Sequence, residues 1–258
     1  MAVDVSKLII TQIDQIMAFN NANDLEFIMD ELTDATISNS EDRVDITGKG
    51  GRIIGSLKRN KSVTISGTNG LLVGGALAAQ TGTEIEQGTY AVRMSEIIVV
   101  NSNAATITQE AVGTTGAEVQ IYVKNPNGSC GQALEQVADT PQTGQYTYTP
   151  GGKALAFFAG DYEDGTELIA IYDAQVESAK ISNDSEKYSK TLRMYIDVTC
   201  QDNCDNEYHG QFYIPRADFS GTFDLTFGND PTTHAFEATA LAGGCTGSTN
   251  LWDFIVFE

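Results

Sequence analysis

The sequence predicts a mainly β protein, a two-sheet β-sandwich or barrel-like fold with one short flanking α-helix. Three observations predict it. Apolar and polar residues alternate with period two in several segments, turn residues separate these segments, and only 19% of the residues are charged while 25 are glycine. Alternation of this kind is typical of a strand with one buried face and one solvated face. Many short strands separated by turns indicate a sandwich or barrel.

The alternating segments place the predicted strands. They are residues 61–67, 119–123, 192–198 and 219–227, and residues 167–181 predict one long strand or a bulged pair. Turn signals lie between them at Asn125-Pro126-Asn127-Gly128, Thr149-Pro150-Gly151-Gly152 and Gly228-Asn229-Asp230-Pro231. Because no Pro- or Ser-rich linker divides the chain, we expect a single domain over residues 1–258.

The first third of the chain predicts a hairpin followed by a long irregular segment. Residues 13–19 and 24–32 flank the polar turn 20–23, which is the pattern of a β-hairpin. From Thr33 to Leu57 the alternation is lost in a polar, glycine-containing stretch. We predict a long loop or hairpin there, a feature that is usually functional when it occurs within a compact domain.

One short flanking helix is predicted, and a weaker capping signal allows a second. In residues 68–80, Leu72, Ala76 and Ala79 share a helical face, and Thr68 or Asn69 is the expected N-cap. The second, shorter helix would cover residues 131–138, with Ser129 as its cap.

Composition and charge exclude several functions. The formal net charge of −20 gives a surface that repels nucleic acid and anionic membranes. No run of roughly 18 apolar residues predicts a membrane span. The first residues lack a basic run followed by an apolar run, so no signal peptide is expected.

The sequence predicts no catalytic, cofactor-binding or metal-binding residues. Only His209 and His234 are histidines, and neither a Gly-x-Ser-x-Gly elbow nor a phosphate-binding glycine loop occurs. The spacing of Cys200, Cys204 and His209 fits no common zinc pattern. The four cysteines are expected to be free thiols: Cys130, Cys200, Cys204 and Cys245.

Charge is unevenly distributed along the chain. No acidic residue occurs between Asp45 and Glu84. This window contains the residues that we predict to lie at a subunit interface, namely Lys49, Arg52, Lys58, Arg59 and Lys61. The acidic candidates for a lumen or an interface are Asp34, Glu41, Asp42 and Asp45. A basic strip that meets an acidic face on another copy would give head-to-tail association.

The order of these features resembles the major tail tube proteins of long-tailed, siphovirus-type bacteriophages. The resemblance rests on the order of the segments and on their general residue character, over about half of the chain. It includes no diagnostic short motif. Its segments are Lys7–Gln15, Asp24–Leu32, Asp45–Arg52, Lys61–Gly70, Phe223–Phe227, Asp230–Phe236 and Leu251–Trp252. Residues 110–165 have no counterpart and are expected to be an elaboration on the outer surface.

The resemblance implies a structural virion protein of the phage tail. Six copies would form a ring, and rings would stack head to tail into a tube whose lumen delivers DNA without binding it specifically. The implied partners are other copies of the chain and the tail proteins at the tube ends, with assembly in the host cytoplasm. The family has no catalytic residues, so none are expected here.

Two other functions fit the same composition. A capsid decoration or head–tail joining protein can share the acidity and the β content. A carbohydrate-binding β-sandwich module would expose aromatic side chains, for which the candidates are Tyr146, Tyr148, Tyr162 and Tyr172.

Overall fold

The computed structural model describes residues 7–229, 231–243 and 249–257, and these ranges are mainly β with one α-helix. The chain forms two compact units: unit 1 is Met1–Glu86 with Ile181–Glu258, and unit 2 is Gln87–Lys180. The expected single domain over 1–258 is therefore corrected to two units, and the expected elaboration at 110–165 lies within the larger inserted unit. The boundaries have no Pro- or Ser-rich linker, because the chain crosses them in or directly beside two strands, β5 (Glu86–Val99) and β13 (Glu167–Lys180).

Unit 1 contains an eight-stranded sheet. Its order is β2 (Leu25–Met29), β1 (Leu8–Phe19), β14 (Thr191–Asp202), β15 (Glu207–Phe219), β16 (His234–Ala240), β4 (Ile53–Asn69) and β3 (Leu32–Thr47), with β17 (Asp253–Phe257) paired to β15. The predicted N-terminal hairpin is confirmed, because β1 and β2 pair antiparallel with Ile16 opposite Met29.

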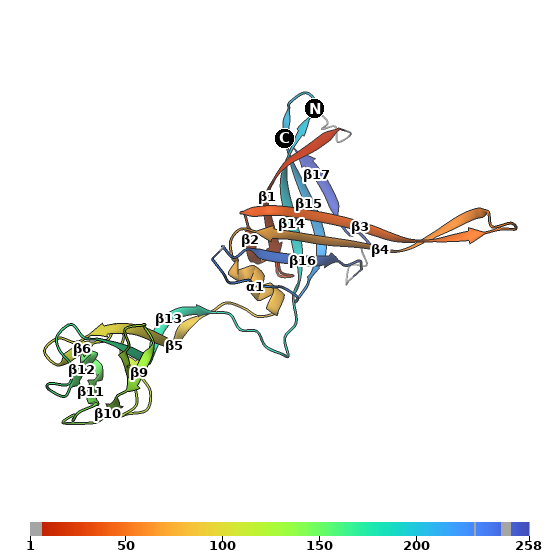
Figure 1. The fold of residues 1–258 in the computed structure, drawn as a ribbon. Helices are drawn as coiled ribbons and strands as arrows, with labels where there is room; N and C mark the ends of the chain where they lie inside the picture. The colour runs from red at the N-terminus through yellow and green to blue at the C-terminus, as the bar shows by residue number, and fades with distance from the viewer. Residues whose placement is uncertain (1–6, 230, 244–248, 258) are drawn as a thin grey trace. The chain divides into compact units, whose positions relative to one another are not determined.

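The sheet of unit 1 turns back on itself to enclose a core. Strands β3, β4 and β16 cross over β1, β14 and β15, as a sandwich requires (Figure 1). The alternation predicted for residues 192–198 is confirmed, since all four of its apolar side chains are buried: Leu192, Met194, Ile196 and Val198. They pack against Val63 and Ile65, the apolar pair predicted for the strand at 61–67.

The predicted first helix exists as α1 (Gly74–Thr81), with Ala76 and Ala79 buried. Leu72 precedes the helix and is exposed, and the expected caps are wrong. The N-cap is Val73, without a side-chain bond, because Thr68 and Asn69 belong to β4. The helix lies close to β2, and a Cβ on Gly75 would lie 2.5 Å from the carbonyl oxygen of Glu26.

Two other predicted elements are wrong. Residues 131–138 form strands β9 (Cys130–Ala133) and β10 (Glu135–Gln136) instead of a helix, because β9 pairs antiparallel with β8 (Val119–Lys124). The predicted strand 219–227 ends at its first residue, Phe219. The following residues make no ladder, and the side chain of Phe227 is 84% exposed.

Unit 2 has two sheets and its own core. One sheet has the order β5 (Glu86–Val99), β13 (Glu167–Lys180), β8 and β9, with β7 (Ala111–Val112) paired to β13. The other has the order β10, β11 (Gln145–Thr149), β12 (Ala154–Phe157) and β6 (Ala104–Thr106). The long strand predicted at 167–181 is confirmed as the single strand β13. The core includes the fully buried Leu155, Leu168 and Ile121.

Candidate assembly surface

The irregular segment predicted at 33–57 is an extended hairpin, made by β3 and β4. The two strands stay paired from Leu32 opposite Asn69 to Thr47 opposite Ile53. The tip turns at Gly50 and Gly51, whose φ values of 81° and 76° suit glycine. Residues 39–62, which we call the distal hairpin, are exposed except for the half-buried Gly48 and Gly55. Figure 1 shows the distal hairpin extending beyond the other strands of unit 1.

The distal hairpin displays large aliphatic side chains to solvent. Val44 lies directly opposite Leu57, and Ile46 lies opposite Gly55, so these three aliphatic residues share one face. The exposed fractions are 40% for Val44, 52% for Ile46, 57% for Ile53, 71% for Ile54 and 56% for Leu57. An exposed apolar group of this kind on an extended strand pair marks a surface for association.

Acidic and basic candidates lie together on this hairpin. The Lys58 ammonium is 2.8 Å from the Glu41 carboxylate, and this hydrogen-bonded contact lowers the pKa of Glu41. Arg43 is 2.7 Å from Asp45, and Asn60 donates to Asp42 at 2.8 Å. Three of the four predicted acidic residues are therefore beside the basic strip on the same copy.

The remaining candidates differ in their surroundings. Asp34 lies nearer the root of the hairpin, where its backbone is opposite Thr68. Among the described residues, no carboxylate lies within salt-bridge distance of four basic candidates: Lys49, Arg52, Arg59 and Lys61. Of the predicted basic strip, Lys58 forms an ion pair with Glu41 within its own hairpin, and the charge of Lys61 also contributes to the lowered pKa of Glu41.

A second apolar feature opens between the two layers of unit 1. This apolar cleft has a volume of about 350 Å³. It is lined by Ile10 and Ile13 of β1, Ile37 of β3, Ile196 and Val198 of β14, and the rings of Phe212 and Trp252. Ile10 remains 51% exposed at its edge. The sequence predicted β14 and the second half of β1, but it placed Ile37 in an irregular segment and predicted no strand at Phe212.

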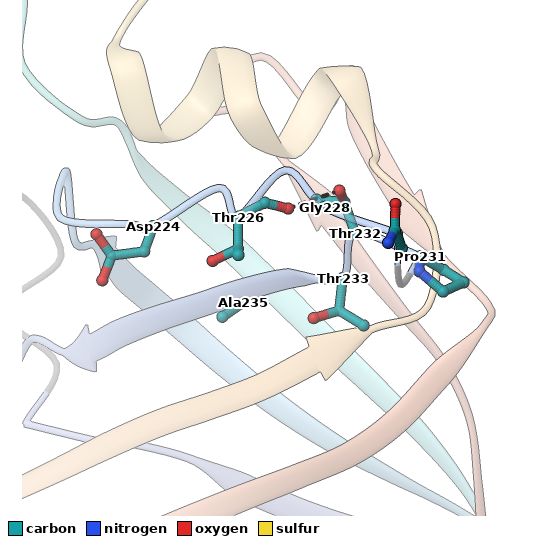
Figure 2. A pocket seen from close by; sticks show the side chains of 8 residues that line it. Asp224, Thr226, Gly228, Pro231, Thr232, Thr233 and Ala235 are labelled. Carbon is teal, nitrogen blue, oxygen red and sulfur yellow. Dashed lines mark hydrogen bonds between the residues drawn. The ribbon is translucent and has the colours of Figure 1, made fainter.

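A smaller polar pocket, of about 190 Å³, is formed by the segment before β16 (Figure 2). Asp224 supplies a carboxylate, and Thr226 and Thr233 also line the pocket. The Thr232 hydroxyl already donates to the Thr226 carbonyl oxygen at 2.8 Å. In the described part of the chain no group of three or more His, Cys, Asp or Glu residues could hold a metal ion. We assign no ligand to this pocket.

The two histidines have different surroundings. His209 is exposed on β15, with its ring 5.9 Å from that of Phe257. His234 is fully buried, and its Nε2 lies 2.8 Å from Oε1 of Gln80 in α1. Its Nδ1 and the Oδ1 of Asn69, the residue opposite it in β4, have no hydrogen-bond partner. His234 therefore links the helix to the sheet, and burial lowers the pKa of its imidazole.

This burial predicts that His234 makes unit 1 sensitive to acid. Above the ordinary pKa of 6.5 both the folded and the unfolded chain hold a neutral imidazole. As the pH falls below that value the unfolded chain binds the proton first, so the free energy of unfolding should fall by at most about 1.4 kcal/mol per pH unit. Urea unfolding from pH 7.5 to 5, compared with His234→Gln, measures this. An unchanged difference between the two proteins across the range would contradict it.

The cysteines lie in unlike environments. Cys200 is buried in β14, which raises the pKa of its thiol, whereas Cys130 and Cys204 are exposed, and all three are free. Cys245 lies outside the described residues.

The tyrosines proposed for sugar binding mostly face inward. Tyr146 and Tyr172 are 1% and 2% exposed in the core of unit 2. Tyr148 and Tyr162 are half-buried and pack against the same core. The structure does not gather these four rings into an exposed aromatic platform.

The fold and the distal hairpin define a mainly β protein with an exposed apolar surface suited to association. A family model described as the YomU/Tube protein family matches residues 8–253. The chain therefore belongs to the YomU/Tube protein family, and this membership indicates a phage tube-type structural protein. A comparison with the curated proteins found no match. In the described ranges, no helix has the length and apolarity needed to span a bilayer.

Proposed function

We propose that this protein is the major tail tube protein of a long-tailed, siphovirus-type phage. Six copies form a ring, rings stack head to tail, and DNA is delivered through the lumen. The observation that carries the proposal is the distal hairpin, whose Ile53, Ile54 and Leu57 are each more than half exposed in a member of a tube family. Such side chains are stabilised when a neighbouring copy removes them from water.

The charge of the chain suits a tube through which DNA passes. With a net charge of −20, most surfaces of the protein repel phosphate, so DNA passes without specific binding. Asp34, Glu41, Asp42 and Asp45 are all exposed and are available to a lumen or an interface. The cations at Lys49, Arg52, Arg59 and Lys61 then contact acidic groups of an adjacent copy.

The proposal also gives the protein its place and partners. It forms the tail of the virion after assembly in the host cytoplasm, and it meets other tail proteins at the two ends of the tube. It acts without catalysis and without a cofactor.

Electron microscopy of the purified protein at increasing concentration tests the proposal, together with labelling of intact virions by an antibody against the chain. We expect six-fold rings and tubes, and label along the whole length of the tail. Label confined to heads, or a protein that stays monomeric while virion tails remain unlabelled, would reject it.

Assembly should change the dynamics of residues Thr33–Asn60. The outer part of this segment buries little apolar surface within one copy, whereas ordering a residue costs roughly 1–2 kcal/mol. We therefore predict faster amide hydrogen exchange there in the monomer than in the tube, with Leu192–Val198 of β14 as the internal reference. Equal exchange of Thr33–Asn60 in the two forms would show that neighbours do not order it.

A further inference from the structure

Among the described residues of unit 1, two apolar surfaces are not covered by other side chains, and both are lined by large aliphatic or aromatic groups. One is the aliphatic group of the distal hairpin, and the other is the apolar cleft. We infer that the apolar cleft of one copy receives the aliphatic tip of the distal hairpin of a second copy. This inference rests on the proposed function and names the receiving site of the hairpin.

A copy cannot fill its own cleft with its own hairpin tip. Asn39 of β3 still lines the cleft, and from there β3 continues in register with β4 as far as Thr47. From Asn39 to Ile46 the strand advances by seven residue steps, roughly 23 Å at the usual rise of a strand. The tip therefore lies far from the cleft of its own copy, and Figure 1 shows the two strands extending away from the rest of unit 1.

The two surfaces agree in chemistry and size. The cleft is lined mainly by Ile, Val, Phe and Trp side chains and has about 350 Å³ of space, which is in the range of sites that bind apolar groups. The hairpin offers branched aliphatic side chains, with Ile54 the most exposed at 71%. The pairing of β3 with β4 fixes the spacing of these side chains along the hairpin, and burial in the cleft would remove them from water.

Charge favours a second copy over other occupants. Residues 39–62 contain six basic and three acidic side chains, a net charge of +3 in a chain whose total is −20. The distal hairpin is therefore attracted to the body of another copy, while two distal hairpins repel each other. The acidic body opposes the approach of anionic membranes and nucleic acid.

Cross-linking between two variants tests the inference. The background protein carries Cys130→Ser, Cys200→Ala, Cys204→Ser and Cys245→Ser, because the free Cys200 lies directly opposite Ile10 in the neighbouring strand. One variant adds Ile54→Cys at the hairpin tip, and the other adds Ile10→Cys at the edge of the cleft. We expect a short bis-maleimide to give cross-linked dimers in the mixture under assembly conditions, and not with either variant alone.

Ile9→Cys is the matched control for Ile10→Cys. Ile9 is 63% exposed and is next to Ile10 in β1, but successive side chains of a strand face opposite sides and Ile9 does not line the cleft. Equal cross-linking of the Ile9→Cys and Ile10→Cys variants, or cross-linking of Ile54→Cys to itself, would overturn the inference.

Aspartate at the same two positions gives a second measurement. Ile10→Asp should lower the yield of tubes about tenfold or more, whereas Ile9→Asp should have little effect. Thermal unfolding should show both variants folded. If wild-type tubes form, Ile10→Asp also forms them and no cross-link appears, the inference fails while the proposed function stands. Cross-linked dimers without tubes in the protein or the virion would support the cleft contact and reject the tube.

Discussion

Replacing Gly82 by alanine is expected to destabilise unit 1 by about 3 kcal/mol, the sum of a strained backbone and a steric clash. Gly82 ends α1 with a φ of 71°, and a Cβ there would lie 1.9 Å from the carbonyl oxygen of Tyr188. The Tyr188 segment cannot move away freely, because the backbone N–H of Lys190 donates to Ala79 at 2.8 Å. Urea unfolding followed by fluorescence of Trp252, the single tryptophan, measures unit 1 directly.

Gly50→Ala separates backbone strain from the clash. Gly50 has a similar φ of 81°, but a Cβ there would have no atom within 4 Å. Its replacement should cost only about 1 kcal/mol, from the left-handed conformation alone. An equal loss of stability in the Gly82 and Gly50 variants would show that contact with Tyr188 contributes nothing.

Reversing three charges on the distal hairpin is expected to abolish stacking while unit 1 stays folded. Arg52→Glu, Lys58→Glu and Arg59→Glu together change the net charge of residues 39–62 from +3 to −3. All three side chains are exposed, so the core is untouched. The variant hairpin repels the acidic body that the native hairpin attracts, and Glu41 also loses its contact with Lys58. Sedimentation and electron microscopy measure tube formation.

Lys187→Glu is the control for charge reversal elsewhere in unit 1. It is an exposed lysine in the segment between β13 and β14, outside the hairpin. It should assemble as the wild type does, and added salt should weaken wild-type stacking because exposed charges are screened. Normal tubes from the triple variant would show that the basic strip does not set the contact.

The sequence predicted best where one face of a strand is buried. In β14, water on one side and a core on the other impose the alternation that was visible from Leu192 to Val198. The distal hairpin could not be predicted in this way. Both of its faces are exposed, so no buried side requires period two, and its strands are defined by their mutual hydrogen bonds.

Residues 131–138 show how tertiary contacts override a weak local signal. A possible cap at Ser129 favoured a helix, but the chain follows β8, and the N–H of Leu134 donates to Ile121 at 2.8 Å. The pairing of β9 with β8, in which Ala133 lies opposite Tyr122, leaves no trace in a helical capping pattern. The apolar cleft could not be predicted either, because it depends on tertiary structure. Its lining residues come from strands that are far apart in the sequence, such as β1, β3 and β14.

The route of the chain through unit 2 determines how easily this unit can be inserted or deleted during evolution. The chain enters unit 2 along β5 and leaves it along β13, and these strands are neighbours in one sheet. An insert whose two ends lie side by side can be gained, lost or exchanged without rerouting the host fold. Deleting unit 2 and joining the two ends would therefore leave the strand order of unit 1 unchanged.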